Sequence, residues 1–523
     1  MRKEYVMAID QGTTNTKVAL FSKDGSLVYF ASKEHAQIYP KPGWVEEDPS
    51  EIWQNVKACI KEVIKIGKVD ANKIDSIGIT NQRESLVVWD KETGNPLYNV
   101  IVWQDRRSSK LVDALKQEYE ELIKEKTGLV PDAYFTGPKL LWLTQNVESI
   151  KDKIYSGKAL LGTIDSWIIW NLTKGTKDSL TPEMKGAYVT DYSNASRTML
   201  FNINSLSWDP DLLEIEGKIP LDSLPLPRPS SEKLTYGFSG DESAGLFASL
   251  RIPVTADIGD QQGALFGQAC FKKGEIKSTY GTGNFILINT EDEKIKSKAN
   301  LLTTVFYSTE EGKAKYALEG SVFITGAAVQ WLKDGLNLVK DVEEIEELAK
   351  QVADTGGVYF VPAFTGLAAP YWDQYARGLL IGVTAATTTA HIARATLESI
   401  AYLNRDIIEM MVKDTGISIE EIKVDGGGSK NNFLMQLQAD ITGIKILRPY
   451  VLETTAQGAS YLAGLATGFW QSLEELRQNW KPERGFYPEI SAYERDKLYA
   501  GWRAAVKRAM GWAIDVPWAY GLS

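Results

Sequence analysis

Cysteine and histidine are scarce in this chain of 523 residues, which contains two of each. Cys59 and Cys270 lie far apart in sequence, so we expect no disulfide framework, and a reducing compartment is favoured. Together with His35 and His391 they form no recognisable zinc cluster. The fold is therefore not expected to depend on disulfides or on a structural metal.

Long hydrophobic runs are missing as well. No apolar stretch approaches the roughly 20 residues that span a bilayer, and residues 1–4 lead into a strand without the apolar core of a secretory signal. The net charge of 58 − 68 = −10 argues against nucleic acid as the main partner, although a local basic site for phosphates is compatible with it. We expect a cytoplasmic protein with no membrane insertion and no nucleic acid partner.

The common nucleotide-binding loops are also missing. Neither the G-x-x-x-x-G-K-[ST] loop nor a G-x-G-x-x-G segment after a strand occurs, which disfavours P-loop and dinucleotide-binding folds. Instead, glycine-containing turns occur at residues 10–17 (DQGTTNTK), 278–284 (STYGTGN) and 424–432 (VDGGGSKNN). Glycine lets the backbone approach an anion, and exposed N–H groups suit phosphate. The first and last turns, each after a strand-like run, predict two halves of the chain closing on one nucleotide.

The length exceeds what one core supports, so we expect two or more domains. The Asp-Gly pair at 24–25 predicts a hairpin, and further strands are expected at 76–80 and 86–89. Asp48 predicts the N-cap of a helix whose apolar face carries Cys59, which we expect to lie in the core. Strands therefore alternate with helices in the first part of the chain.

Residues 175–250 are rich in polar and turn-forming residues and predict irregular structure on the first domain. A second alternating series begins near residue 257, with a helix expected across 342–352 and a strand at 358–361. The tail contains a predicted helix at 493–512, which we expect on the surface or on a partner. Because no low-complexity linker separates the halves, they should meet across a wide interface.

Two longer segments carry a family resemblance. Residues 134–142 (YFTGPKLLW) match one signature, and residues 378–382 (GLLIG), continued through His391 to Glu398, match the other. On these motifs the chain resembles the FGGY family of carbohydrate kinases, within the actin-like ATPase superfamily. The resemblance implies an α/β fold of two actin-like (ribonuclease H-like) domains flanking a central catalytic cleft. It further implies a polyol-binding domain at 1–262 and a nucleotide-binding domain at 263–523.

Four further segments resemble those of the family members that phosphorylate glycerol: residues 81–85 (NQRES), 102–107 (VWQDRR), 259–262 (GDQQ) and 362–367 (PAFTGL). This resemblance covers nearly the whole chain. It implies ATP-dependent phosphorylation of glycerol to sn-glycerol 3-phosphate, with ATP and Mg²⁺ as cofactors. It also suggests a homo-oligomer, either a dimer or a tetramer.

The residue chemistry agrees with that activity, because a small polyol requires several hydrogen-bonding groups and one apolar wall. Arg83 can donate to adjacent hydroxyls and Glu84 can accept from them, whereas Trp103 supplies a flat wall. The structural alternatives are ordinary core packing for Trp103 and Phe285 and a surface ion pair for Arg83 with Glu84. The expected polyol-binding residues are Arg83, Glu84, Trp103, Tyr134, Asp260, Gln261 and Phe285.

Asp260 is the expected catalytic base, because the attacking hydroxyl must lose its proton to a nearby carboxylate. Its structural alternative is a helix N-cap. Asp10 is the expected Mg²⁺ partner, directly or through water, and its alternative is a turn-forming aspartate after a strand. The resemblance implies that nucleotide is bound by Thr13, Thr14, Asn15, Lys17, Thr282, Gly326, Gln330, Gly427 and Asn431.

Two rival functions stay open: a kinase for another small polyol or sugar on the same fold, and a non-catalytic actin-like or sugar-sensing protein that binds nucleotide without transfer. The presence of both Asp10 and Asp260 argues against the second. Relatives regulated by fructose 1,6-bisphosphate carry a basic glycine loop where this chain reads residues 245–251 (GLFASLR). Neither His35 nor His391 lies in that region, where other relatives are phosphorylated on histidine. We expect neither form of regulation.

Overall fold

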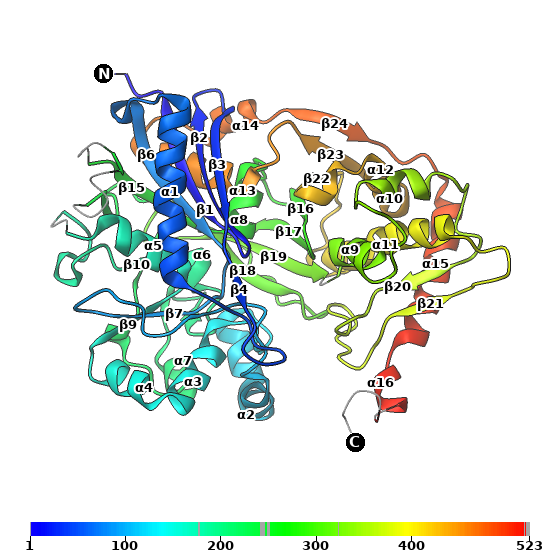
Figure 1. Ribbon diagram of the computed structural model, residues 1–523, viewed down its shortest axis with the longest axis horizontal. Coiled ribbons are helices and arrows are strands. Elements are labelled where there is room, and N and C mark those ends of the chain that lie inside the picture. Colours follow the sequence, from blue (N-terminus) through cyan, green and yellow to red (C-terminus); the bar gives the residue numbers. More distant parts are fainter. Residues whose placement is uncertain are drawn as a thin grey trace.

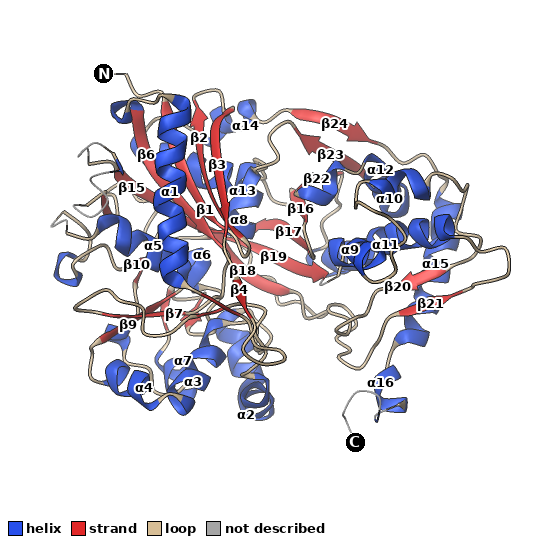
Figure 2. Cartoon of the chain, viewed as in Figure 1, coloured by secondary structure: helices blue, strands red, loops and turns tan. Residues whose placement is uncertain are grey.

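The computed structural model describes residues 2–175, 178–240, 246–247, 251–322, 324–516 and 518. The chain forms two halves, each built around one mixed β-sheet (Figures 1 and 2). In the first sheet the strands follow the order β14 (Gly237–Phe238), β15 (Pro253–Gly259), β6 (Ile74–Asn81), β1 (Tyr5–Gln11), β2 (Asn15–Ser22) and β3 (Leu27–Glu34). The expected hairpin around residues 24–25 is formed by β2 and β3.

The second sheet has a closely similar core. Its order is β18 (Leu302–Tyr307), β19 (Lys315–Val322), β17 (Asn284–Glu291), β16 (Ile276–Tyr280), β22 (Glu421–Asp425), β23 (Lys445–Pro449) and β24 (Pro482–Phe486). In each half a run of antiparallel strands continues into two parallel ones. In the first half β3, β2 and β1 lead into β6 and β15, and in the second β18, β19, β17 and β16 lead into β22 and β23. The expectation of two related α/β domains is confirmed, and the turns after β1 and β16 occupy equivalent places.

Both faces of the first sheet are covered, which explains why its central strands read as continuous apolar runs. Met7 and Ile9 of β1 pack with α1 (Pro49–Gly67) and α5 (Ile164–Thr173). Val6 and Ala8 point to the opposite face and pack with α13 (Thr454–Thr467). Asp48 caps α1 by accepting the N–H of Ser50 at 2.7 Å, and Cys59 on this helix lies in the core as expected.

Helices α8 (Asp260–Gly267) and α13 cross at the junction of the two halves. A Cβ atom on Gly458 would lie 1.9 Å from the carbonyl oxygen of Gly263, and one on Gly267 would lie 2.0 Å from that of Thr454. The two backbones therefore touch directly. Buried side chains from both halves, among them Ala256 and Leu287, share one apolar cluster here, so the halves meet across a wide interface as expected.

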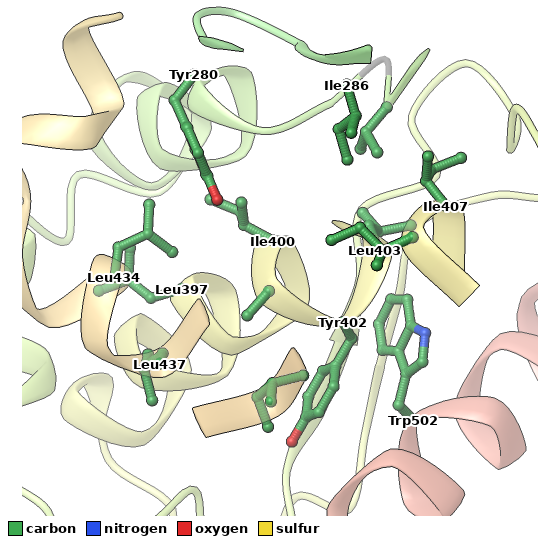
Figure 3. Packing of buried hydrophobic residues seen from close by; sticks show 14 of the residues in the cluster. Tyr280, Ile286, Leu397, Ile400, Tyr402, Leu403, Ile407, Leu434, Leu437 and Trp502 are labelled. Atoms are coloured by element: carbon green, nitrogen blue, oxygen red, sulfur yellow. The ribbon is translucent and has the colours of Figure 1, made fainter. Parts of the chain in front are cut away.

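The core of the second half forms around α11 (Thr389–Thr415) and α12 (Asn432–Thr442), as Figure 3 shows. The tail helix α15 (Ala492–Ala509) packs on the surface of this half, in agreement with the sequence. Its Trp502 is fully buried and stacks on Tyr402, with ring centroids 5.4 Å apart. Trp502 and Tyr499 of the tail thus complete this core.

The expected helix across 342–352 is shorter in the structure. Helix α10 spans only Glu344–Ala349, and Glu343 provides no side-chain cap at its start. The chain then turns at Gly356 and Gly357, both with positive φ, before the next strand. The expected strand follows as β20 (Tyr359–Val361), paired with β21 (Leu379–Ile381). Helices α9 (Gly326–Asp334), α14 (Leu473–Asn479) and α16 (Trp512–Asp515) complete the second half.

The first half carries many short elements beyond its sheet. They are β4 (Gln37–Ile38), β5 (Glu46–Glu47), β7 (Val87–Asp90), β8 (Val100–Ile101), α2 (Ser109–Thr127), α3 (Thr136–Asn146), α4 (Glu148–Tyr155), β9 (Ala159–Gly162), β10 (Val189–Asp191), α6 (Tyr192–Ala195), β11 (Phe201–Asn202), β12 (Ser207–Trp208), α7 (Pro210–Ile215) and β13 (Leu226–Arg228). In the described part of the segment expected to be irregular, short helices and strands are joined by turns and coil. Of residues 245–251, discussed above for regulation, 245 and 248–250 lie outside the described residues. No helix in the described ranges has the length and apolarity needed to cross a membrane.

Candidate active site

Asp260 begins α8 directly after strand β15. Gly259 is the N-cap and Asp260 is the first helical residue, so the alternative reading of Asp260 as the N-cap is wrong. The Asp260 carboxylate accepts the N–H of Gln261 at 2.7 Å and the Gln261 side-chain amide at 3.0 Å. Its side chain stays 27% exposed, so an oxygen of this carboxylate can still reach a substrate.

Arg83 lies beside Asp260, because β6 and β15 are neighbouring parallel strands that end at the same edge of the sheet. Arg83 Nε is 2.9 Å from Asp260 Oδ1. Gly259 permits this approach, since a Cβ there would lie 2.7 Å from Arg83 Cδ. The structure therefore brings together two residues that are 177 positions apart in the chain.

A buried ion cluster extends from this pair, and two of its members were missed by the sequence analysis. Glu319 of β19 accepts Arg83 Nη1 at 2.6 Å and Arg83 Nη2 at 3.2 Å. A second arginine, Arg197, binds the same carboxylate. It donates from Nη2 to Glu319 at 3.0 Å and from Nε to Glu84 at 2.6 Å. All four side chains are at most 2% exposed, so the surface ion pair considered for Arg83 and Glu84 is wrong. Burial raises the pKa of Glu319, but Arg197 and Arg83 outweigh it and lower the pKa to about 2.

Three aromatic rings form a wall next to the ion cluster. Trp103 lies with its ring centroid 5.6 Å from that of Tyr134 and 6.3 Å from that of Phe285, both at steep interplanar angles. Trp103 Nε1 donates to Thr13 Oγ1 at 2.9 Å. The wall thus joins a strand of the second half to the turn after β1. Its rings are half-buried, and Phe285 and Tyr134 also pack against neighbouring apolar clusters.

Asp10 is a strand residue, paired in register with Lys17, so the alternative of a turn-forming aspartate is wrong. Burial raises its pKa to about 7; Lys17 opposes this shift, and Glu453 and Asp260 add to it. Lys17 forms an ion pair with Glu453 at 2.7 Å. Among the described residues none donates a hydrogen bond to the Asp10 carboxylate, which leaves its oxygens available beside the turn at Thr13.

The second set of expected nucleotide residues gathers at the ends of β16 and β22. The Gly326 N–H, at the start of α9, donates to the Gly281 carbonyl at 3.2 Å, beside Thr282. Gly427 follows β22, and no atom lies within 4 Å of a Cβ built there, so its backbone faces open space. Asn431 caps α12 by accepting the N–H of Leu434 at 2.8 Å. Gln330 lies farther along α9, where it donates to Asp334 at 2.6 Å.

Comparisons with known proteins agree with this arrangement. Residues 5–267 match the N-terminal domain of the FGGY family of carbohydrate kinases, and residues 276–467 match its C-terminal domain. This chain belongs to the FGGY family.

Several FGGY kinases resemble the chain over nearly its whole length. It is 55% identical over 513 residues to a glycerol kinase of Saccharolobus islandicus, covering 98% of each chain. It is 52% identical over 510 residues to glycerol kinase 2 of Thermotoga maritima, covering 97% of this chain and 99% of the relative. The crystal structure of Plasmodium falciparum glycerol kinase with ADP superposes with a TM-score of 0.88 at 38% identity, covering 97% and 99%. Gluconate kinase from Lactobacillus acidophilus gives 0.82 at 26% identity, with the same coverage.

The residues that hold the FGGY site together left only a weak signal in the sequence. Glu319 is the one charged residue inside the strand run 316–322 (YALEGSV), and a charge is seldom buried in a strand unless it is paired. Arg197 lies in a segment without periodicity, where nothing in the sequence indicates its partner. The sequence therefore indicated Arg83 and Glu84 but not the two residues that pair with them.

Proposed function

We propose that this FGGY kinase transfers the γ-phosphoryl group of ATP to glycerol, giving sn-glycerol 3-phosphate, with Asp260 as the general base. The single observation that carries the proposal is the setting of Asp260. Its carboxylate is partly exposed, beside an arginine and an amide that can hold a polyol and beside an aromatic wall. The high identity to curated glycerol kinases over the whole chain supports glycerol as the acceptor.

The first half would bind the polyol. Arg83 has one Nη2–H beyond its bonds to Glu319, and Glu84 Oε2 accepts no hydrogen bond from any described residue. One can donate to a hydroxyl and the other can accept from it, while Trp103 and Phe285 cover the carbon chain. One donor, one acceptor and an aromatic cover suit a short polyol with adjacent hydroxyls.

Asp260 would accept the proton of the attacking substrate hydroxyl while the oxygen of that hydroxyl bonds to the γ-phosphorus. The bond between the γ-phosphorus and the β,γ-bridging oxygen of ATP breaks at the same time. That oxygen leaves with ADP and carries the negative charge. Arg83 Nε stays beside the same carboxylate and holds it toward the substrate. Closure of the two halves would exclude water and limit wasteful hydrolysis of ATP.

The phosphates would lie between the turn with Thr13, Thr14, Asn15 and Lys17 and the loops with Thr282, Gly326, Gln330, Gly427 and Asn431. Asp10 fits a Mg²⁺ ion, because its carboxylate is unbonded and Mg²⁺ in kinases uses one or two carboxylates together with waters and phosphate oxygens. When bound, the ion would neutralise charge on the phosphates. No group of three metal-ligating side chains occurs among the described residues, which agrees with a site completed by the nucleotide.

The remaining expectations belong to the same proposal. The polyol-binding domain would span 1–262 and the nucleotide-binding domain 263–523. The enzyme would act in the cytoplasm as a homodimer or homotetramer. Size-exclusion chromatography with light scattering tests the assembly, and a single monomeric species would contradict it.

The activity is tested by ADP release from Mg·ATP with glycerol, xylulose, gluconate, erythritol and no acceptor. Glycerol-selective turnover is the expected result. Turnover on another acceptor alone would overturn the substrate and leave the base intact. The absence of any acceptor-dependent turnover would favour a protein that binds nucleotide without transfer.

A further inference from the structure

Lys277 is a fully buried lysine on β16 that reaches from the second half into the first turn of α8. Its ammonium donates to Gln261 Oε1, to Thr279 Oγ1 at 2.8 Å and to the Phe285 carbonyl at 3.3 Å. The three donors of this group are therefore all used. Among the residues expected to bind the polyol, the ammonium contacts the Gln261 side chain and the backbone carbonyl of Phe285.

The contact fixes the direction of the Gln261 amide. An ammonium group has only donors, so the end of the amide that faces Lys277 must be the carbonyl oxygen. The NH₂ end then faces the other way and donates to Asp260 Oδ2 at 3.0 Å. A reversed amide would bring its NH₂ against the ammonium and its oxygen against the carboxylate, so both contacts would become repulsive.

We propose that Lys277 is a positioning residue that orients Gln261, and through it the carboxylate of Asp260, for proton abstraction. The inference rests on the proposed role of Asp260 as the base. A residue of the second half would thus orient the catalytic base, which lies in the first half. The three groups form one line of contacts across the junction, from β16 through Gln261 to Asp260.

The electrostatic setting supports a charged lysine at neutral pH. Burial lowers the pKa of Lys277 to about 8, while Asp425, Asp260 and Glu319 oppose the shift and Arg83 adds to it. The Lys277 ammonium therefore stays protonated at pH 7 and can only donate hydrogen bonds.

Lys423 provides a matched control. It pairs in register with Lys277 on the neighbouring strand β22, and it is also buried. Its ammonium donates to the Gln268 carbonyl at 2.8 Å, just beyond the opposite end of α8, and lies 4.3 Å from the Trp480 ring centroid. Lys423→Met therefore removes a buried lysine of the same sheet without touching Gln261.

The test is a double-mutant cycle on kcat with Lys277→Met and Gln261→Leu, with Lys423→Met as control. It is run with whichever polyol the wild type accepts, so that a wrong substrate and a wrong role for Lys277 give different results. Because a positioned base contributes about 10²–10⁴-fold, we expect Lys277→Met to lower kcat by about tenfold to a hundredfold. The KM for ATP should stay within about twofold.

In the Gln261→Leu background the same change should have almost no further effect, since residues that act as a unit are not additive. Lys423→Met should keep kcat within about twofold. Lys277→Gln, whose amide can both donate and accept, should fold and still lose activity; it replaces the methionine variant in the cycle if that protein does not fold. Additive losses, or equal losses for Lys277 and Lys423, would overturn the inference, as would a wild type without polyol-dependent turnover.

Discussion

Glu319 Oε1 and Arg197 Nη2 meet at 3.0 Å across the junction between the two halves of the molecule. The same carboxylate binds Arg83, so one residue of the second sheet holds two arginines of the first half. A buried charge of this kind is costly to leave unpaired, and the cluster therefore couples the stability of the junction to the geometry of the proposed polyol site.

Glu319→Gln should therefore weaken both folding and polyol binding. The amide keeps the shape but removes the charge that faces two buried guanidinium groups, and we expect a loss of about 3 kcal/mol in the free energy of unfolding. Denaturant titration and the KM for glycerol provide the two measurements. Glu421→Gln on β22, which breaks the partly exposed pair with Lys445 on β23, should cost less than about 1 kcal/mol. Equal effects of the two changes would contradict the role given to the cluster.

Asp260→Asn should abolish most turnover and leave the fold intact. An amide cannot accept the proton of the attacking hydroxyl, so we expect kcat to fall by about 10²–10⁴-fold. Thermal denaturation and the KM for ATP should change little, because Asn keeps an oxygen toward the N–H of Gln261. A variant with near wild-type turnover would rule out Asp260 as the base.

Asp10 should make the response to Mg²⁺ depend on pH. Its pKa of about 7 means that a proton competes with the ion, and the ionised fraction rises about tenfold from pH 6 to pH 8. The Mg²⁺ concentration for half-maximal activity should fall by about tenfold over the same range. Asp10→Asn should need much more Mg²⁺ at every pH and show no such trend. A wild type whose Mg²⁺ requirement is constant from pH 6 to pH 8 would argue against this residue as the metal partner.

Glu216 should lower the stability of the protein as the pH rises. Both of its carboxylate oxygens are buried without a hydrogen-bond partner among the described residues, and burial raises its pKa to about 8. The folded chain therefore keeps a proton that the unfolded chain releases near its ordinary pKa of 4.5. The stabilisation is full below about pH 4.5 and is lost as the pH rises through 8, by roughly 5 kcal/mol.

Thermal denaturation from pH 5 to pH 9 measures this effect. Glu216→Met should flatten the decline in Tm and raise Tm at pH 8. Glu214→Met, on helix α7 just before Glu216 and with its side chain 61% exposed beside Lys218, should leave the decline unchanged. Parallel pH profiles for the two variants would exclude Glu216 as its source.

The sequence predicted the site residues at the ends of strands, but it missed the side chain that reaches from the second sheet into the first half. Asp10, Arg83 and Asp260 each follow or end a buried strand, and the turn chemistry around them is local, so their meeting could be anticipated. Glu319 could not, because the side chain that reaches the first half depends on how the second sheet is placed against it. The partner of Arg83 was accordingly expected to be a substrate or Glu84, whereas Glu319 binds it most directly.

Burial depth was the other quantity that the sequence could not supply. Asp10 was expected in a turn, yet it lies within β1 under α13 and Glu453, which come from the far end of the chain. Likewise the tail helix was expected on the surface, where it does lie, but the depth of Trp502 in the second core depends on α11, about a hundred residues earlier. Contacts over such separations carry no local pattern.

The direct contact of α8 with α13 leaves no room for a side chain at the junction. Gly458 and Gly263 bring the two backbones together, and a Cβ atom at 458 would lie 1.9 Å from the Gly263 carbonyl oxygen. A single methyl group there would have to push the two helices apart. The absence of a side chain at this contact therefore fixes the spacing between α8 and α13.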